Sequence, residues 1–117
     1  MRSLFGALEE RYAHPGCGHL WERLNARASV QDPDGWQHIF GLVTGPVILL
    51  VHDSQGQCAF RLQSPAELQN VIEETSNFEF YVTNDELSYL LGFNHHDFLI
   101  GAGEAEAGVR VLRHVPN

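Results

Sequence analysis

The strongest constraint on the fold is the helix-start sequence Ser64-Pro65-Ala66-Glu67. Ser is a favoured N-cap residue, Pro suits the first helical position, and Glu three residues after the cap completes a capping box. Core-facing residues then recur at spacings of three and four, as on one side of a helix; they are Leu68, Val71, Ile72 and Thr75. The chain therefore has to pack one side of this helix against another element.

Strand patterns flank that helix on both sides. An apolar run at Val47–Asp53 is followed by the turn-forming sequence Ser54–Gln57 and a second run at Cys58–Leu62, which predicts a β-hairpin. After the helix, Phe78–Thr83 alternates, with Phe78, Phe80 and Val82 on one face of a predicted strand and Glu79, Tyr81 and Thr83 on the other. Further strands are expected at Leu87–Phe93 and Phe98–Ile100, with a flexible or loosely helical link at Gly101–Gly108 and an edge strand at Val109–Val115.

The amino-terminal part has helical spacing at Ser3–Ala13 and again at His19–Ala28, separated by a Pro- and Gly-containing break. Asp32–Gly35 predicts a turn, and Trp36–Val43 a short helix or irregular segment. We therefore expect an α+β fold, with a mostly antiparallel sheet, two N-terminal helices and one capped helix packed on the sheet. A length of 117 residues favours a single domain over residues 1–117.

Composition narrows the cellular setting. Acidic residues at Glu9 and Glu10 interrupt the apolar core that a secretory signal needs, so we expect a cytoplasmic protein. The longest apolar run, Pro46–Val51, is far short of the roughly 20 residues that cross a bilayer. Cys17 and Cys58 are not in a C-x-x-C pair and are expected to be reduced.

Charge is unevenly distributed along the chain, which has a formal net charge of -8. No Lys or Arg lies between Arg61 and Arg110, whereas most of the acidic residues do: Glu67, Glu73, Glu74, Glu79, Asp85, Glu86, Asp97, Glu104 and Glu106. Such a field attracts a basic partner. It also argues against nucleic-acid binding, which needs a stripe of Lys and Arg.

Two clusters could carry chemistry. Asn94-His95-His96-Asp97 lies between predicted strands, where it is either a polar turn, a partner contact, or a site in which a carboxylate orients a His as general base. His14, Cys17 and His19 have zinc-ligand side chains, but their spacing matches no common zinc motif. The alternative for these three residues is a helix-ending loop.

Tyr81 is the aromatic residue that the strand pattern does not assign to the core. It shares a strand face with Glu79 and Thr83, so it is either an exposed anchor among carboxylates or part of a second face covered by a helix. The sequence has no G-x-S-x-G motif and no complete glycine-rich phosphate loop, which argues against hydrolase and nucleotide-binding functions.

From Phe78 to Gly103 the chain resembles small bacterial domains in which an F-E-x-Y-type strand precedes an aromatic-Leu-Leu strand and an Asn-His-His-Asp turn, although Tyr89 stands where that pattern has tryptophan. The resemblance implies no catalytic role. In size, acidity and cytosolic character the chain is also similar to immunity proteins of bacterial toxin systems, including barstar-like nuclease inhibitors. That similarity implies an inhibitor that binds a basic toxin or nuclease.

We therefore expect a non-enzymatic acidic binding protein, monomeric or homodimeric, without cofactor, that occludes the cleft of a basic partner. Its expected partner-binding residues are Glu79, Tyr81, Asp85, Glu86, His95 and Asp97. One alternative is a small metal-binding or hydrolytic domain that uses His14, Cys17 and His19 or the His95 and His96 pair. Another is a homodimer subunit with a structural role only.

Overall fold

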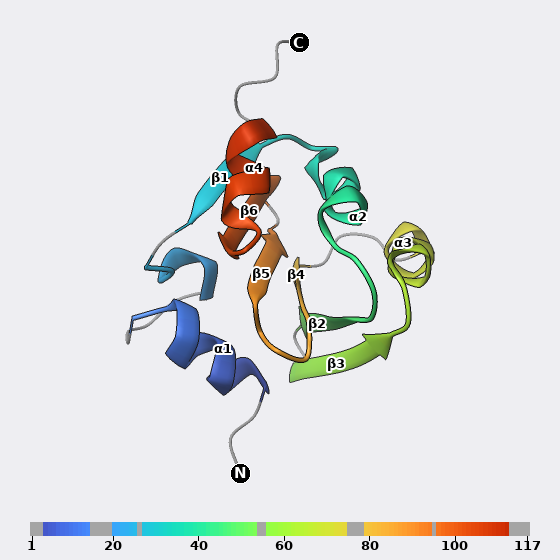
Figure 1. Ribbon diagram of the computed structural model, residues 1–117, viewed down its shortest axis with the longest axis horizontal. Coiled ribbons are helices and arrows are strands. Elements are labelled where there is room, and N and C mark those ends of the chain that lie inside the picture. The colour runs from blue at the N-terminus through green and yellow to red at the C-terminus, as the bar shows by residue number, and fades with distance from the viewer. Residues whose placement is uncertain are drawn as a thin grey trace.

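A six-stranded antiparallel sheet forms the centre of the computed structural model, which describes residues 4–14, 20–25, 27–53, 56–74, 79–94 and 96–112 (Figure 1). The strand order is β1-β6-β5-β4-β2-β3, so β1 and β3 are the two edges. The strands are β1 (Ala28–Gln31), β2 (Val47–Asp53), β3 (Gly56–Leu62), β4 (Glu79–Thr83), β5 (Tyr89–Phe93) and β6 (Phe98–Gly103).

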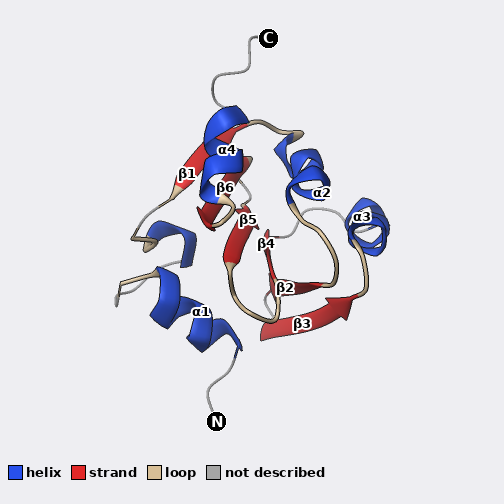
Figure 2. Ribbon diagram, in the orientation of Figure 1, coloured by secondary structure: helices blue, strands red, loops and turns tan. Residues whose placement is uncertain are grey.

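Helices cover both faces of the sheet (Figure 2). On the first face, α2 (Ile39–Leu42), α3 (Pro65–Glu74) and α4 (Glu106–Leu112) pack on alternate strand residues such as Leu49, Val82 and Leu91. On the second face, α1 (Leu4–Tyr12) and the 3-10 turn η1 (Leu20–Glu22) pack on Leu50 and Leu90. A further 3-10 turn, η2 (Gly35–His38), leads into α2. The expected α+β fold is confirmed.

The predicted start of α3 is also confirmed. The Glu67 N–H donates to the Ser64 Oγ at 3.3 Å, as an N-cap requires. The Glu67 carboxylate accepts from the Gln63 N–H at 2.9 Å, one residue earlier than in a standard capping box. Leu68 and Ile72 are buried against the first face, and Thr75 lies outside the described residues.

Three local predictions were wrong or incomplete. In the segment His19–Ala28, predicted to be a helix, the described residues contain only the short turn η1. The segment ends in β1, where Ala28 pairs with Gly101. The link expected at Gly101–Gly108 instead extends β6 to Gly103 and begins α4 at Glu106. Val109–Leu112 is helical rather than an edge strand, because Ala105, Val109 and Leu112 follow helical spacing and all pack in the first core.

Within the described ranges, no helix is long and apolar enough to cross a membrane.

Gly101 sets the close approach of α4 to β6. A Cβ at this position would lie 2.6 Å from Val109 Cγ2 and 2.9 Å from the Ala105 carbonyl oxygen. We expect Gly101→Ala to lower the free energy of unfolding by roughly 1 to 3 kcal/mol, because the helix would have to move out. Gly41→Ala is the matched control, since nothing lies within 4 Å of its Cβ position and Ala favours a helix. Urea unfolding of both variants measures the difference, and equal stability of the two would contradict this packing.

Candidate functional site

The connection between β4 and β5 carries two neighbouring acidic residues in a hydrogen-bonded turn. We call this connection, Asn84-Asp85-Glu86-Leu87-Ser88, the acidic loop. The Asn84 Oδ1 accepts a hydrogen bond from the Ser88 N–H at 3.0 Å, and its Nδ2 donates to the Ser88 Oγ at 2.7 Å. The Leu87 N–H donates to the Asn84 carbonyl at 3.1 Å. Asn is a common turn former because its side chain bonds nearby groups in this way.

Two other parts of the chain hold the acidic loop in place. From the end of α1, the Tyr12 hydroxyl donates to the Leu87 carbonyl at 2.5 Å, and the Glu104 N–H donates to the Ser88 carbonyl at 3.0 Å. Between them, Gly103 has a φ of 65°, and a Cβ there would lie 2.7 Å from both the Ser88 carbonyl oxygen and the Tyr12 hydroxyl. Only glycine lets β6, α1 and the acidic loop meet at this point.

Leu87 has a φ of 54°, in the left-handed region that side chains rarely adopt. That backbone conformation costs roughly 1 to 2 kcal/mol for a residue with a Cβ. The side chain of Leu87 is partly buried against the second-face core, and this packing together with the Tyr12 bond offsets the strain. The positive φ of Leu87 is therefore supported by tertiary contacts from outside the loop.

The acidic loop presents its charge to solvent. Asp85 and Glu86 are both exposed, and so is Glu104, whose backbone is bonded to the loop. Arg61 of β3 forms an ion pair with Asp85, with side chains 62% and 54% exposed. An exposed pair of this kind stabilises by at most about 1 kcal/mol, so it orients Asp85 without removing it from reach of a stronger cation.

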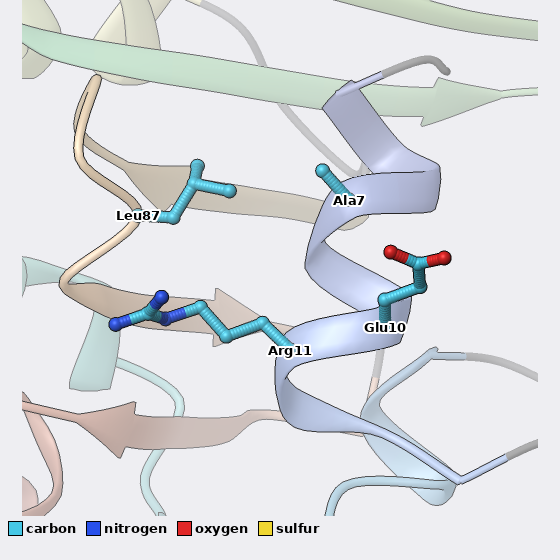
Figure 3. A pocket seen from close by; sticks show the side chains of 4 residues that line it. All are labelled: Ala7, Glu10, Arg11 and Leu87. Atoms are coloured by element: carbon cyan, nitrogen blue, oxygen red, sulfur yellow. The ribbon is translucent and has the colours of Figure 1, made fainter.

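A shallow hollow of about 360 Å³ lies beside the acidic loop, lined by Ala7, Glu10 and Arg11 of α1 and by Leu87 (Figure 3). Leu87 and Ala7 point toward one another across it. Arg11 extends toward the loop, and the Glu10 carboxylate is directed away from Leu87. The hollow therefore adds to the acidic loop an apolar shoulder formed by Ala7 and Leu87, with the charged residues Glu10 and Arg11 beside it.

The base of the acidic loop is a pair of buried hydroxyl residues. The Thr83 Oγ1 donates to the Tyr89 carbonyl at 2.6 Å, and the Tyr89 hydroxyl donates to the Thr83 carbonyl at 3.3 Å. Burial, together with the nearby Glu86 carboxylate, raises the pKa of Tyr89 to about 12. Tyr89 is thus a neutral structural hydroxyl, which fixes the two strands from which the loop projects.

The Asn94-His95-His96-Asp97 segment is a turn at the other end of β5. Asn94 is 2% exposed, and its Oδ1 accepts hydrogen bonds from the His96 N–H at 2.9 Å and the Phe98 N–H at 3.0 Å. The Asp97 carbonyl accepts from the Asp32 N–H at 2.8 Å. The His96 ring lies edge-on to Trp21, with centroids 6.1 Å apart. The turn and the backbone bonds of Asn94 are confirmed, and His95 lies outside the described residues.

The structure separates the four predicted acidic contacts into two pairs. Glu79 begins β4 and lies at the sheet end that holds Asp97, whereas Asp85 and Glu86 follow the end of β4. A five-residue strand spans roughly 14 Å, and its two ends face opposite directions. Glu79 and Asp97 are partly buried, so of these four residues Asp85 and Glu86 are the two that form an adjacent, exposed pair.

Tyr81 is not an exposed anchor. It is 5% exposed in the second-face core, where its hydroxyl accepts a hydrogen bond from the Trp21 N–H at 3.3 Å. Burial raises the pKa of Tyr81 well above its ordinary range. The alternative interpretation, a second face covered by a helix, is the correct one, because α1 and η1 supply the cover.

The metal alternative receives no support from the residues that can be placed. His14 Nδ1 lies 3.3 Å from the Asn25 Oδ1, whereas Cys17 and His19 are outside the described ranges. No group of three or more His, Cys, Asp or Glu side chains that could hold a metal ion occurs among the described residues.

Sequence patterns predicted the turn at Asn84–Glu86 but placed Leu87 inside a strand. They did not indicate that Tyr12 and Glu104, distant in the sequence, fasten the acidic loop. The glycine at position 103 was the available signal, since an isolated glycine in a strand often marks a close backbone approach.

Comparison with models of known protein families, with curated proteins and with solved structures found no match to this chain. Inference about function therefore rests on the geometry above.

The buried tyrosine beneath the acidic loop predicts a dependence of stability on alkaline pH. The pKa of Tyr89 rises from 10.0 to about 12 on folding, so its contribution is fully present below pH 10 and is lost as the pH rises through 12. The loss amounts to roughly 3 kcal/mol. Tyr89→Phe should be less stable at neutral pH yet lose less stability between pH 10 and 12, as measured by urea unfolding at each pH. If the free energy of unfolding of the variant fell with pH as steeply as that of the wild type, Tyr89 would not be the group that causes the loss.

Proposed function

We propose that this protein is a non-enzymatic inhibitor or immunity-type protein that binds a basic protein partner, such as a toxin or nuclease, through the acidic loop. One observation carries the proposal: Asp85 and Glu86 are adjacent, exposed carboxylates on a backbone held by Asn84, Tyr12 and Glu104. A loop that is ordered before binding loses little conformational entropy when a partner docks.

Charge supports the choice of partner. The net charge of -8 accelerates the approach of a cationic protein, and the effect declines over roughly 8 Å at physiological salt. The two loop carboxylates then provide the short-range pairing that fixes orientation. Because the pair of Asp85 with Arg61 is exposed, a guanidinium on the partner can replace Arg61 at little cost.

The apolar shoulder supports an interface rather than simple ion binding. Ala7 and Leu87 border a hollow directly beside the two carboxylates, so a partner can bury apolar surface there while it pairs with the charges. Interfaces commonly combine a dry centre with a charged rim. The opposite end of the sheet presents less exposed negative charge to a partner, because Glu79 and Asp97 are partly buried.

Reversal of the loop charges tests this site. We expect immobilised wild-type protein to retain a basic protein from an extract of its source cells, with retention that weakens as salt rises. Asp85→Arg combined with Glu86→Arg should lower the affinity for that protein by roughly a hundredfold or more, since it turns two attractions into repulsions. Mass spectrometry identifies the partner, and titration of the purified partner gives the affinities.

A matched double reversal separates the site from the overall charge. Glu73 and Glu74 are also adjacent and exposed, but they lie on α3. Glu73→Arg with Glu74→Arg changes the net charge by the same amount and should retain most of the binding. Equal loss in both double variants would mean that only total charge matters, and full binding by the loop variant would refute the proposed site.

A further inference from the structure

The edge strand β3 presents an open row of backbone groups. It is last in the strand order, with β2 on one side and no strand on the other among the described residues. Its pairing with β2 is continuous from Val47↔Leu62 to Asp53↔Gly56, without a bulge. Residues 58–61 are exposed. A long, regular and uncovered edge is a template for the addition of another strand.

The two edges of the sheet differ in their protection. The edge strand β1 has four residues, and α4 packs against it. In contrast, β3 has seven residues, contains no Pro, no Lys and no acidic residue, and contacts its neighbouring helix α3 less extensively. Natural proteins usually protect an edge with one of these devices. Its centre instead carries Phe60, whose side chain is 50% exposed.

We propose that β3 pairs antiparallel with β3 of a second copy about a two-fold axis beside Ala59, which joins two sheets into one of twelve strands. Along an antiparallel pair of strands, hydrogen-bonded and non-hydrogen-bonded residue pairs alternate. A two-fold axis makes the pairs on its two sides identical, so it must pass through the pair that one residue forms with its own copy. Ala59 is the midpoint of Gly56–Leu62, so this register opposes all seven residues. Cross-strand neighbours would then be Ala59 with Ala59 and Phe60 with Cys58.

The net charge of -8 opposes self-association, but β3 itself contains no acidic residue. The single charged residue of β3 is Arg61, and in the proposed register it stands opposite Gln57 rather than opposite its own copy. The two Phe60 positions are diagonal neighbours on one face, about 7 to 8 Å apart and within reach of aromatic side chains. Each exposed Phe60 thus gains an apolar partner without a like-charge contact.

The proposed ladder is large enough for a specific interface. Seven opposed residues include three or four hydrogen-bonded pairs with two bonds each, which gives roughly six to eight hydrogen bonds. Typical interfaces have roughly ten. The acidic loop follows β4, and β2 lies between β4 and β3, so among the described residues the loop meets this contact only through the exposed ion pair of Asp85 with Arg61. Failure of one proposal would therefore leave the other standing.

Opposed charges at Ala59 test the register. Sedimentation equilibrium of the full wild-type chain, under reducing conditions, should give twice the monomer mass of 13.1 kDa. We expect Ala59→Asp alone and Ala59→Lys alone each to weaken self-association at least about tenfold, because each places like charges face to face. An equimolar mixture of the two variants should restore the dimer, which also shows that both variants fold.

Val111→Asp is the control. Val111 is 63% exposed on α4, and α4 packs on β1 and β6, at the opposite edge of the sheet from β3. This variant should dimerise as the wild type does. A wild-type chain that stays monomeric at about 100 µM, a dimer that survives both Ala59 substitutions, or a variant mixture that fails to associate would each overturn the proposal.

Discussion

Burial of the sheet on both faces is the constraint on which the rest of this structure depends. Adjacent residues along the central strands enter different cores, as with Tyr81 and Val82 of β4 or Leu90 and Leu91 of β5. Few polar side chains fit in such strands, and Thr83 and Tyr89 do so by bonding the backbone of each other's strand. Exposed charges must therefore lie on helices, on turns at the strand ends and at the β3 edge.

This constraint changes the meaning of the acidic half of the chain. Contiguity in sequence suggested one acidic face, but a meander of antiparallel strands sends successive turns to opposite ends of the sheet. The β4–β5 connection therefore carries Asp85 and Glu86 away from Asp97 in the next connection. Charge density in a sequence predicts the sign of a surface, whereas strand topology determines which charges can meet one partner.

Local signals predicted much of the fold, and non-local contacts explain what they missed. The α3 cap, the β2–β3 hairpin and the polar turn at Asn94 depend on neighbouring residues, so the sequence contains their full cause. The helix over Glu106–Leu112 requires a groove that only Gly101 of β6 leaves open, and β1 exists because β6 offers a partner. Likewise the strand pattern correctly placed Tyr81 on the face opposite Phe80 and Val82. Only the tertiary structure could show that α1 covers that face.

The same reasoning bears on how the acidic loop differs from an ordinary surface turn. A flexible turn with two carboxylates would bind cations weakly and without orientation. Here α1 holds the strained backbone at Leu87 through Tyr12, and the start of the β6–α4 connection holds the next residue, Ser88, through the Glu104 N–H. Tertiary contacts thus hold the backbone of the loop that carries two exposed carboxylates. Such presentation of charge beside an apolar shoulder is what the proposed binding role would require.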